Sequence, residues 1–187
     1  TAAGGTPAYS GEGTFTVTSG TYSYTVTDSR GCTATTSITV TEPTVLSASV
    51  VQNGEIPCNG GSTTVTVTAA GGTPAYSGEG TFTVTAGTYS YTVTDSRGCT
   101  ATTSITVTEP TVLSASVVQN GEIPCNGGST TVTVTAAGGT PAYSGEGTFT
   151  VTAGTYSYTV TDSRGCTATT SITVTEPTVL SASVVQN

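Results

Sequence analysis

The chain has 187 residues, a formal net charge of −8 and only 7% charged residues, with no His, Met or Trp. Its three basic residues are Arg and lie far apart along the chain, which argues against nucleic acid as a partner, because phosphate binding needs clustered Lys and Arg. No apolar run approaches the roughly 18 residues that a membrane-spanning helix needs, so we expect no membrane span in this segment.

A block of 67 residues recurs almost letter for letter, starting at Thr1, Thr68 and Thr135. A fixed period of this size is typical of arrays of identical structural units. If each unit starts after Glu-Pro-Thr, the chain divides into a partial repeat lacking its first strands, two complete repeats, and the first strand of a further repeat. These parts span 1–44, 45–111, 112–178 and 179–187. The partial ends lead us to expect that the chain is a window on a longer polymer.

The strands of one complete unit can be predicted in chain order from alternating apolar and polar residues. Leu46, Ala48 and Val50 mark the first strand, which ends at Asn53-Gly54. An irregular stretch at 74–80 follows the second strand. The later strands place Phe82, Val84, Tyr89, Tyr91, Val93, Ile105 and Val107 inward. After the first strand, the predicted strands are Thr63–Thr68, Thr81–Thr85, Thr88–Thr94 and Cys99–Thr108.

Period-2 alternation with turns every 8–12 residues predicts antiparallel sheets that pack as a sandwich. The tight turn Asp95-Ser96-Arg97-Gly98 suits a hairpin, because Asp can bond the turn backbone and Gly can adopt positive φ. Pro110 removes a hydrogen-bond donor and ends the last strand. The predicted fold is therefore all-β, a tandem array of small antiparallel immunoglobulin-like β-sandwich units.

A unit of 67 residues is near the lower size limit for an independent core, so we expect disulfides to support it. In an up-and-down sandwich we expect the second and last strands to run in the same direction in opposite sheets, which places Cys58, just before the second strand, and Cys99, at the start of the last, at the same end. We therefore predict the bridges Cys58–Cys99 and Cys125–Cys166, with Cys32 left over. A Cys32–Cys58 bridge would join different units and is disfavoured by distance. Disulfides indicate an oxidising compartment, so we expect an extracellular or cell-surface location.

The chain offers little for catalysis. Without His or Lys, only carboxylates could act as a general base, and Glu79, Asp95, Glu109 and Glu122 are spread among turns. We interpret them as solvated turn residues, and we expect no enzymatic activity, no cofactor and no metal. A calcium site joining Glu109 to Glu122 between units is a minor alternative.

Two ligand-binding alternatives remain open. Rows of outward Thr, as in Thr81-Phe82-Thr83-Val84-Thr85, could order water as in some ice-binding proteins, although sandwich sheets twist and Thr also suits an exposed strand. Tyr76 or Tyr89 could bind a glycan, but Tyr89 shares a face with Val93, which favours core packing.

Several motifs of the unit, in this order, resemble the SprB-type repeat of Bacteroidota cell-surface adhesins. They are Cys58-Asn59-Gly60-Gly61, Gly71-Gly72-Thr73-Pro74-Ala75-Tyr76, Ala86-Gly87-Thr88-Tyr89, Val93-Thr94-Asp95, Gly98-Cys99-Thr100-Ala101, Ile105-Thr106-Val107 and Glu109-Pro110. Members of that family continue the Pro-Tyr segment into a longer aromatic strand, which Ser77-Gly78-Glu79-Gly80 replaces here. The resemblance implies an immunoglobulin-like unit of a surface adhesin such as the gliding-motility adhesin, exported by the type IX route, with no catalytic residues.

Together these observations predict a structural, non-enzymatic repeat that forms the shaft of a bacterial cell-surface adhesin or extracellular filament. The expected partners are neighbouring repeats and identical chains in a fibre. A surface or glycan ligand is the alternative.

Overall fold

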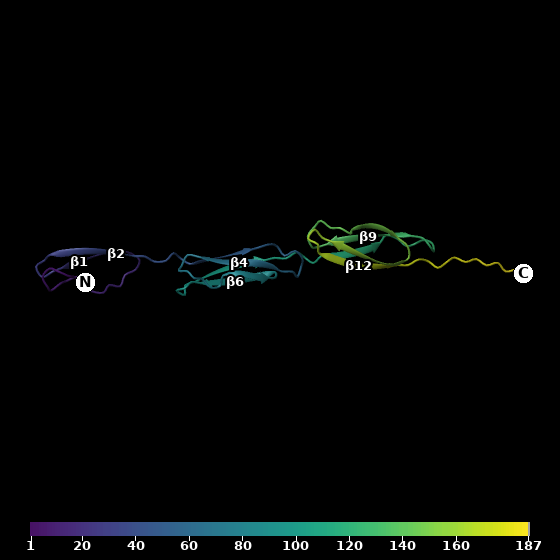
Figure 1. The fold of residues 1–187 in the computed structure, drawn as a ribbon. Helices are drawn as coiled ribbons and strands as arrows, with labels where there is room; N and C mark the ends of the chain where they lie inside the picture. The colour runs from purple at the N-terminus through teal and green to yellow at the C-terminus, as the bar shows by residue number, and fades with distance from the viewer. Residues whose placement is uncertain (187) are drawn as a thin grey trace.

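The computed structural model describes residues 1–186, which form three groups of strands in a row along an elongated molecule (Figure 1). The first group is a hairpin with a long preceding loop, and the second and third groups have five strands each. Within this described range the fold is all-β, and no helix is long and apolar enough to cross a membrane. We call residues 1–44, 45–111 and 112–178 unit 1, unit 2 and unit 3.

Unit 1 contains one antiparallel pair, and unit 2 contains a three-stranded sheet and a two-stranded sheet. In unit 1 the strands are β1 (Gly20–Thr27) and β2 (Thr33–Val40). In unit 2 they are β3 (Ser47–Gln52), β4 (Thr63–Ala70), β5 (Gly80–Val84), β6 (Gly87–Thr94) and β7 (Thr100–Val107). The bounds of these strands agree closely with the ranges predicted from the alternation. Within the two sheets of unit 2 the strand orders are β3-β4-β5 and β6-β7.

Unit 3 has the same strands in the same register. Val50 pairs with Val67 between β3 and β4, and Val117 pairs with Val134 between their equivalents. The strands are β8 (Ser114–Gln119), β9 (Thr130–Ala137), β10 (Gly147–Val151), β11 (Gly154–Thr161) and β12 (Thr167–Val174). The sheets are β8-β9-β10 and β11-β12. The segment 179–186 follows as an extended tail without regular structure (Figure 1).

The two sheets of unit 2 face each other across a small core of β-branched residues. Val65 on β4, Val84 on β5 and Val107 on β7 meet Ile56 from the loop after β3. A second cluster joins Leu46, Val67 and Val93. Alternation selects these residues, because successive side chains on a strand point to opposite faces. Phe82, predicted inward, is a partial exception: it stays 38% exposed and stacks on Tyr91 at 5.0 Å between ring centroids.

Strand direction defines two ends of each unit. The chain enters unit 2 beside the 71–74 loop, where Gly72 N–H donates to the carbonyl of Thr44 at 2.7 Å. The β6–β7 turn also lies at this entry end, where Ser96 N–H donates to the carbonyl of Thr73 at 3.1 Å. The loop between β3 and β4, which carries Cys58, lies at the opposite exit end. The 74–80 stretch adds only an isolated bridge at Ser77 and no full strand.

Candidate functional site

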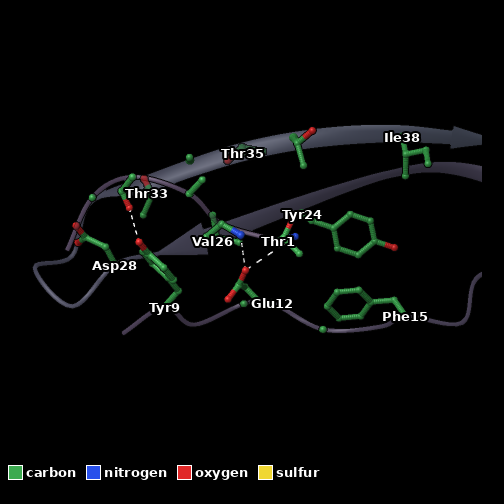
Figure 2. Close-up of a pocket in the computed structure, with 18 of the residues that line it drawn as sticks. Thr1, Tyr9, Glu12, Phe15, Tyr24, Val26, Asp28, Thr33, Thr35 and Ile38 are labelled. Atoms are coloured by element: carbon green, nitrogen blue, oxygen red, sulfur yellow. Dashed lines mark hydrogen bonds and ion pairs between the residues drawn. The ribbon is translucent and has the colours of Figure 1, made fainter. Parts of the chain in front are cut away.

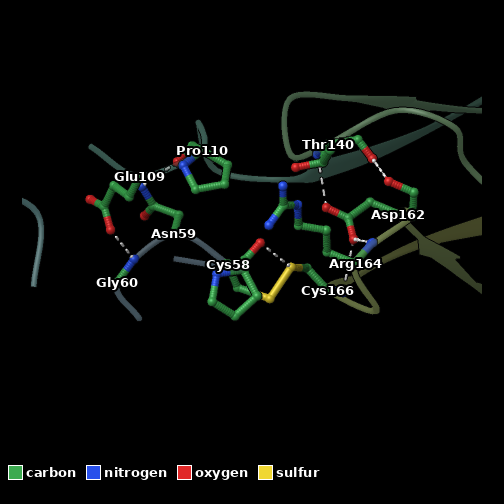
Figure 3. Close-up of a disulfide and its surroundings, with 11 residues drawn as sticks. Cys58, Asn59, Gly60, Glu109, Pro110, Thr140, Asp162, Arg164 and Cys166 are labelled. Carbon is green, nitrogen blue, oxygen red and sulfur yellow. Dashed lines mark hydrogen bonds between the residues drawn. A yellow bond between two sulfur atoms is a disulfide. The ribbon is translucent and has the colours of Figure 1, made fainter. Parts of the chain in front are cut away.

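The strongest chemical feature is the junction between units 2 and 3, where a disulfide joins Cys58 to Cys166 (Figure 3). Cys58 lies at the exit end of unit 2, and Cys166 directly precedes β12 at the entry end of unit 3. Their Cα atoms are 5.8 Å apart, within the usual range for a bridge, and 108 positions separate them in sequence. A closed loop of this length should stabilise the folded chain by about 4–5 kcal/mol in the chain-entropy treatment.

An ion pair and close packing flank the bridge. The Arg164 guanidinium donates to the Glu55 carboxylate across the junction. The sulfur of Cys166 lies 3.3 Å from the carbonyl oxygen of Pro57. Because the ion pair is exposed, we expect it to add at most about 1 kcal/mol and to act mainly on the orientation of the two ends.

The linker between the units is held from both sides. On the unit 2 side, Gly60 N–H donates to the Glu109 carboxylate at 2.6 Å, and the Asn59 amide donates to the Pro110 carbonyl at 3.0 Å. On the unit 3 side, Gly139 N–H donates to the Thr111 carbonyl at 2.9 Å. The linker is therefore hydrogen-bonded to both units, and it follows one defined path between them.

A buried aspartate positions each cysteine at the entry end. The Asp162 carboxylate accepts hydrogen bonds from the backbone N–H groups of Thr140, Arg164 and Cys166, each at 2.9 Å. It therefore ties the β11–β12 turn to the neighbouring loop and presents Arg164 and Cys166 to unit 2. Asp95 makes the same three bonds in unit 2. The sequence pointed to Asp95 as a turn residue, but the long-range bond to the loop needed the structure.

These backbone bonds change the acidity of the aspartates. The N–H of Thr140 holds the pKa of Asp162 below its ordinary value, helped by Cys166 and Arg164 and opposed by desolvation. The N–H of Thr73 does the same for the pKa of Asp95. Because the ionised form is favoured in the folded state, the unfolded chain binds more protons near the ordinary Asp pKa of about 3.9.

We expect stability to be lost as pH falls below about 4, through the lowered pKa values of these aspartates. The double variant Asp95→Asn, Asp162→Asn should melt at a lower temperature than the parent at pH 7. It should then lose less additional stability between pH 5 and pH 3. Far-UV circular dichroism melts at pH 7, 5 and 3 measure this. Parallel acid losses in parent and variant would show that the aspartates do not carry the effect.

The bridge corrects the predicted cysteine pairing. Cys58–Cys99 and Cys125–Cys166 do not form in the structure, because the two cysteines of a unit lie at its opposite ends, a whole strand length apart. An eight-residue strand spans about 26 Å, far beyond the reach of a disulfide. Cys32, Cys99 and Cys125 are exposed thiols. The prediction took the second and last strands of a unit to run in the same direction, whereas β4 and β7 run in opposite directions in the structure.

The four carboxylates singled out in the sequence do not come together. Glu79 accepts from the Ala69 N–H at 2.6 Å, Asp95 fixes a turn, and Glu109 holds the linker. Glu122 follows β8 at the exit end of unit 3, whereas Glu109 lies at its entry end, so the suggested calcium pair is separated. Within residues 1–186 there is no group of three or more His, Cys, Asp or Glu that could hold a metal ion.

The candidate ligand-binding residues take part in packing. The Tyr76 hydroxyl donates to the Gly71 carbonyl at 2.6 Å, and its ring packs against the core. Tyr89 packs on the other core cluster and bonds the Thr85 carbonyl at 3.1 Å. The outward Thr hydroxyls bond one another across strands, as Thr88 does with Thr106 at 3.0 Å.

No protein-family model matches the chain, and no curated protein sequence matches it.

Proposed function

We propose that the chain is a structural, non-enzymatic segment of an extracellular fibre or adhesin shaft, built from immunoglobulin-like units. The observation that carries the proposal is the covalent bridge from the exit end of one unit to the entry end of the next. A bridge in this position shortens the covalent path along the fibre axis. Such an arrangement suits a protein that resists extension.

Other features support the same role. The linker is hydrogen-bonded on both sides, so the angle between units is restrained. A disulfide is typical of oxidising compartments, which favours a location outside the cytoplasm. The SprB-type motifs favour a bacterial cell-surface adhesin, and they carry the narrower part of the proposal, a role in adhesion or gliding.

The test is to shorten and exchange the repeats in cells of the source organism. If the units form a shaft, replacing them with the same number of unrelated immunoglobulin-like units should preserve surface display and attachment. Removing units should reduce attachment in proportion to length. Immunogold labelling of intact cells should place the chain on surface filaments. Label confined to the cytoplasm would overturn the proposal, and loss of attachment after a length-matched exchange would favour direct ligand binding by the units.

A further inference from the structure

The loop that carries Cys58 is held against the linker by the two residues that follow the cysteine (Figure 3). The Asn59 amide donates to the Pro110 carbonyl at 3.0 Å, and Gly60 N–H donates to the Glu109 carboxylate at 2.6 Å. We call these two hydrogen bonds the exit clamp. Because they fix the backbone directly beside Cys58, they keep its Cα atom in a defined place at the exit end of unit 2.

The backbone of Cys166 is held by a carboxylate of unit 3. Asp162 accepts hydrogen bonds from the N–H groups of Thr140, Arg164 and Cys166 itself, and we call these three bonds the entry clamp. Asp162 is buried, so water competes little for them. Each cysteine of the bridge is therefore tied to its own unit by a carboxylate.

The entry clamp is also present where the cysteine is a thiol. Asp95 accepts from Cys99 N–H at 2.9 Å in unit 2, and Asp28 accepts from Cys32 N–H at 2.9 Å at the β1–β2 turn of unit 1 (Figure 2). Both cysteines are free in the structure. The entry clamp therefore forms without a disulfide, and it is the same at the bridged Cys166.

The exit clamp likewise forms without a bridge. Beside the free Cys125, the Asn126 amide donates to the Pro177 carbonyl at 3.1 Å, and Gly127 N–H donates to the Glu176 carboxylate at 2.6 Å. These bonds repeat the ones that stand beside the bridged cysteine of unit 2. Both halves of the junction thus keep their form whether or not a disulfide joins them.

The packing of the units does not depend on the bridge either. Each buried core cluster of units 2 and 3 takes its residues from a single unit. The ion pair of Arg164 with Glu55 also crosses the junction, but it is exposed, and exposed pairs contribute little. Opening the disulfide should therefore loosen unit 3 from unit 2 without exposing either core.

We propose that the junction is a redox-controlled joint, in which the Cys58–Cys166 disulfide opens and closes by thiol–disulfide exchange while units 2 and 3 stay folded. Glu109 and Asp162 are the positioning residues of this joint. Their clamps keep the backbone at each cysteine ordered while the bridge is open, so little conformational entropy is lost when it closes.

The exchange needs a low-molecular-weight thiol such as glutathione, and Cys58 and Cys166 are only half-buried. A glutathione thiolate attacks one protein sulfur, which forms a mixed disulfide and releases the other cysteine as a thiolate. A second glutathione then attacks the glutathione sulfur of the mixed disulfide, which frees the first cysteine and forms oxidised glutathione. Two electrons pass from two glutathione thiols to the bridge, and their two protons end on the cysteines.

This inference adds a control to the joint of the proposed shaft, but it rests on the bridge and the clamps and not on the shaft role. The joint can fail to reclose while the shaft role stands. Equally, a result against surface display would leave the redox chemistry of the joint unaffected.

The test uses the full chain with Cys32→Ser, Cys99→Ser and Cys125→Ser, so that only the bridge between units can form. The chain is equilibrated with mixtures of reduced and oxidised glutathione and trapped by alkylation, and the closed fraction is measured by mass. The open and closed forms should have the same far-UV circular dichroism spectrum, and reoxidation should restore the closed form. Unfolding on reduction, or reoxidation that stops at mixed disulfides, would overturn the proposal.

Matched variants in this background separate positioning from a general loss of stability. Glu109→Ala should lower the equilibrium constant for closing about tenfold or more, since the freed loop must be ordered as the bridge forms. Glu176→Ala removes the same clamp in unit 3, away from the bridge, and should leave closing unchanged. Glu109→Gln should retain most of the closing, because its amide oxygen can still accept from Gly60 N–H. Asp162→Asn should impair closing, and Asp95→Asn should not. Equal losses within either pair, or no loss in Glu109→Ala and Asp162→Asn, would contradict the positioning role.

Discussion

When the chain is pulled from its ends, units 2 and 3 should lengthen far less with the disulfide intact than without it. Tension passes through Cys58 to Cys166, so the residues between them bear no load. A separation of 108 positions at about 3.6 Å per residue hides about 39 nm of contour. Single-molecule force spectroscopy under oxidising conditions should give a fully unfolded extension that is shorter by this length. Cys58→Ser, or a reducing agent, should restore the full extension.

The alternative pairing predicts a different record. Cys58–Cys99 and Cys125–Cys166 would hide two separate segments of about 15 nm each, and reduction of the two disulfides would release them in two steps.

Trypsin provides a control before pulling, since the three Arg are its only cleavage sites in the sequence. With Cys58–Cys166, the fragment 31–97 should be linked to 165–187, and 98–164 should run free. Linkage of all three fragments would contradict the bridge between units.

The second large effect is expected at a glycine that contacts the entering chain. Gly71 has φ of +77°, and a Cβ there would lie 2.1 Å from the Val45 carbonyl oxygen. Gly138 has the same environment, with 2.0 Å to the carbonyl oxygen of Val112. The double variant Gly71→Ala, Gly138→Ala must therefore shift backbone at the start of both complete units. We expect a loss of about 1–3 kcal/mol per unit from this crowding, in addition to the conformational cost.

The matched control is the double variant Gly98→Ala, Gly165→Ala. These glycines have φ of +85° and +84°, but a Cβ there would meet open space. The control should lose only the left-handed backbone cost of about 1–2 kcal/mol per unit. Urea unfolding followed by far-UV circular dichroism compares the two variants. If both variants lose the same amount of stability, the contact between Gly71 and the Val45 carbonyl has no measurable effect on stability.

The part of the fold that the sequence predicts well depends on interactions between residues that are close together in the chain. Val65 and Val67 alternate with Thr and become fully buried, because a period of two places them on one face. The strand at Gly87–Thr94 and the turn after it lie where alternation and turn residues place them. Glu79 and Glu109 are bound to backbone N–H groups and not merely solvated, which residue type alone does not reveal.

By itself, the sequence determined the 67-residue period, the strands and the inward residues, because each depends on neighbours only a few positions apart. The partner of Cys58 depended on the tertiary structure. That partner follows from the number of strand reversals between two cysteines and from which ends of successive units meet. Assigning the second and last strands the same direction places Cys99 beside Cys58, whereas the structure places Cys99 at the other end of the unit. Since a disulfide reaches only about 6 Å between Cα atoms, the stacking of units 2 and 3, and not the spacing of cysteines within a unit, selects Cys166.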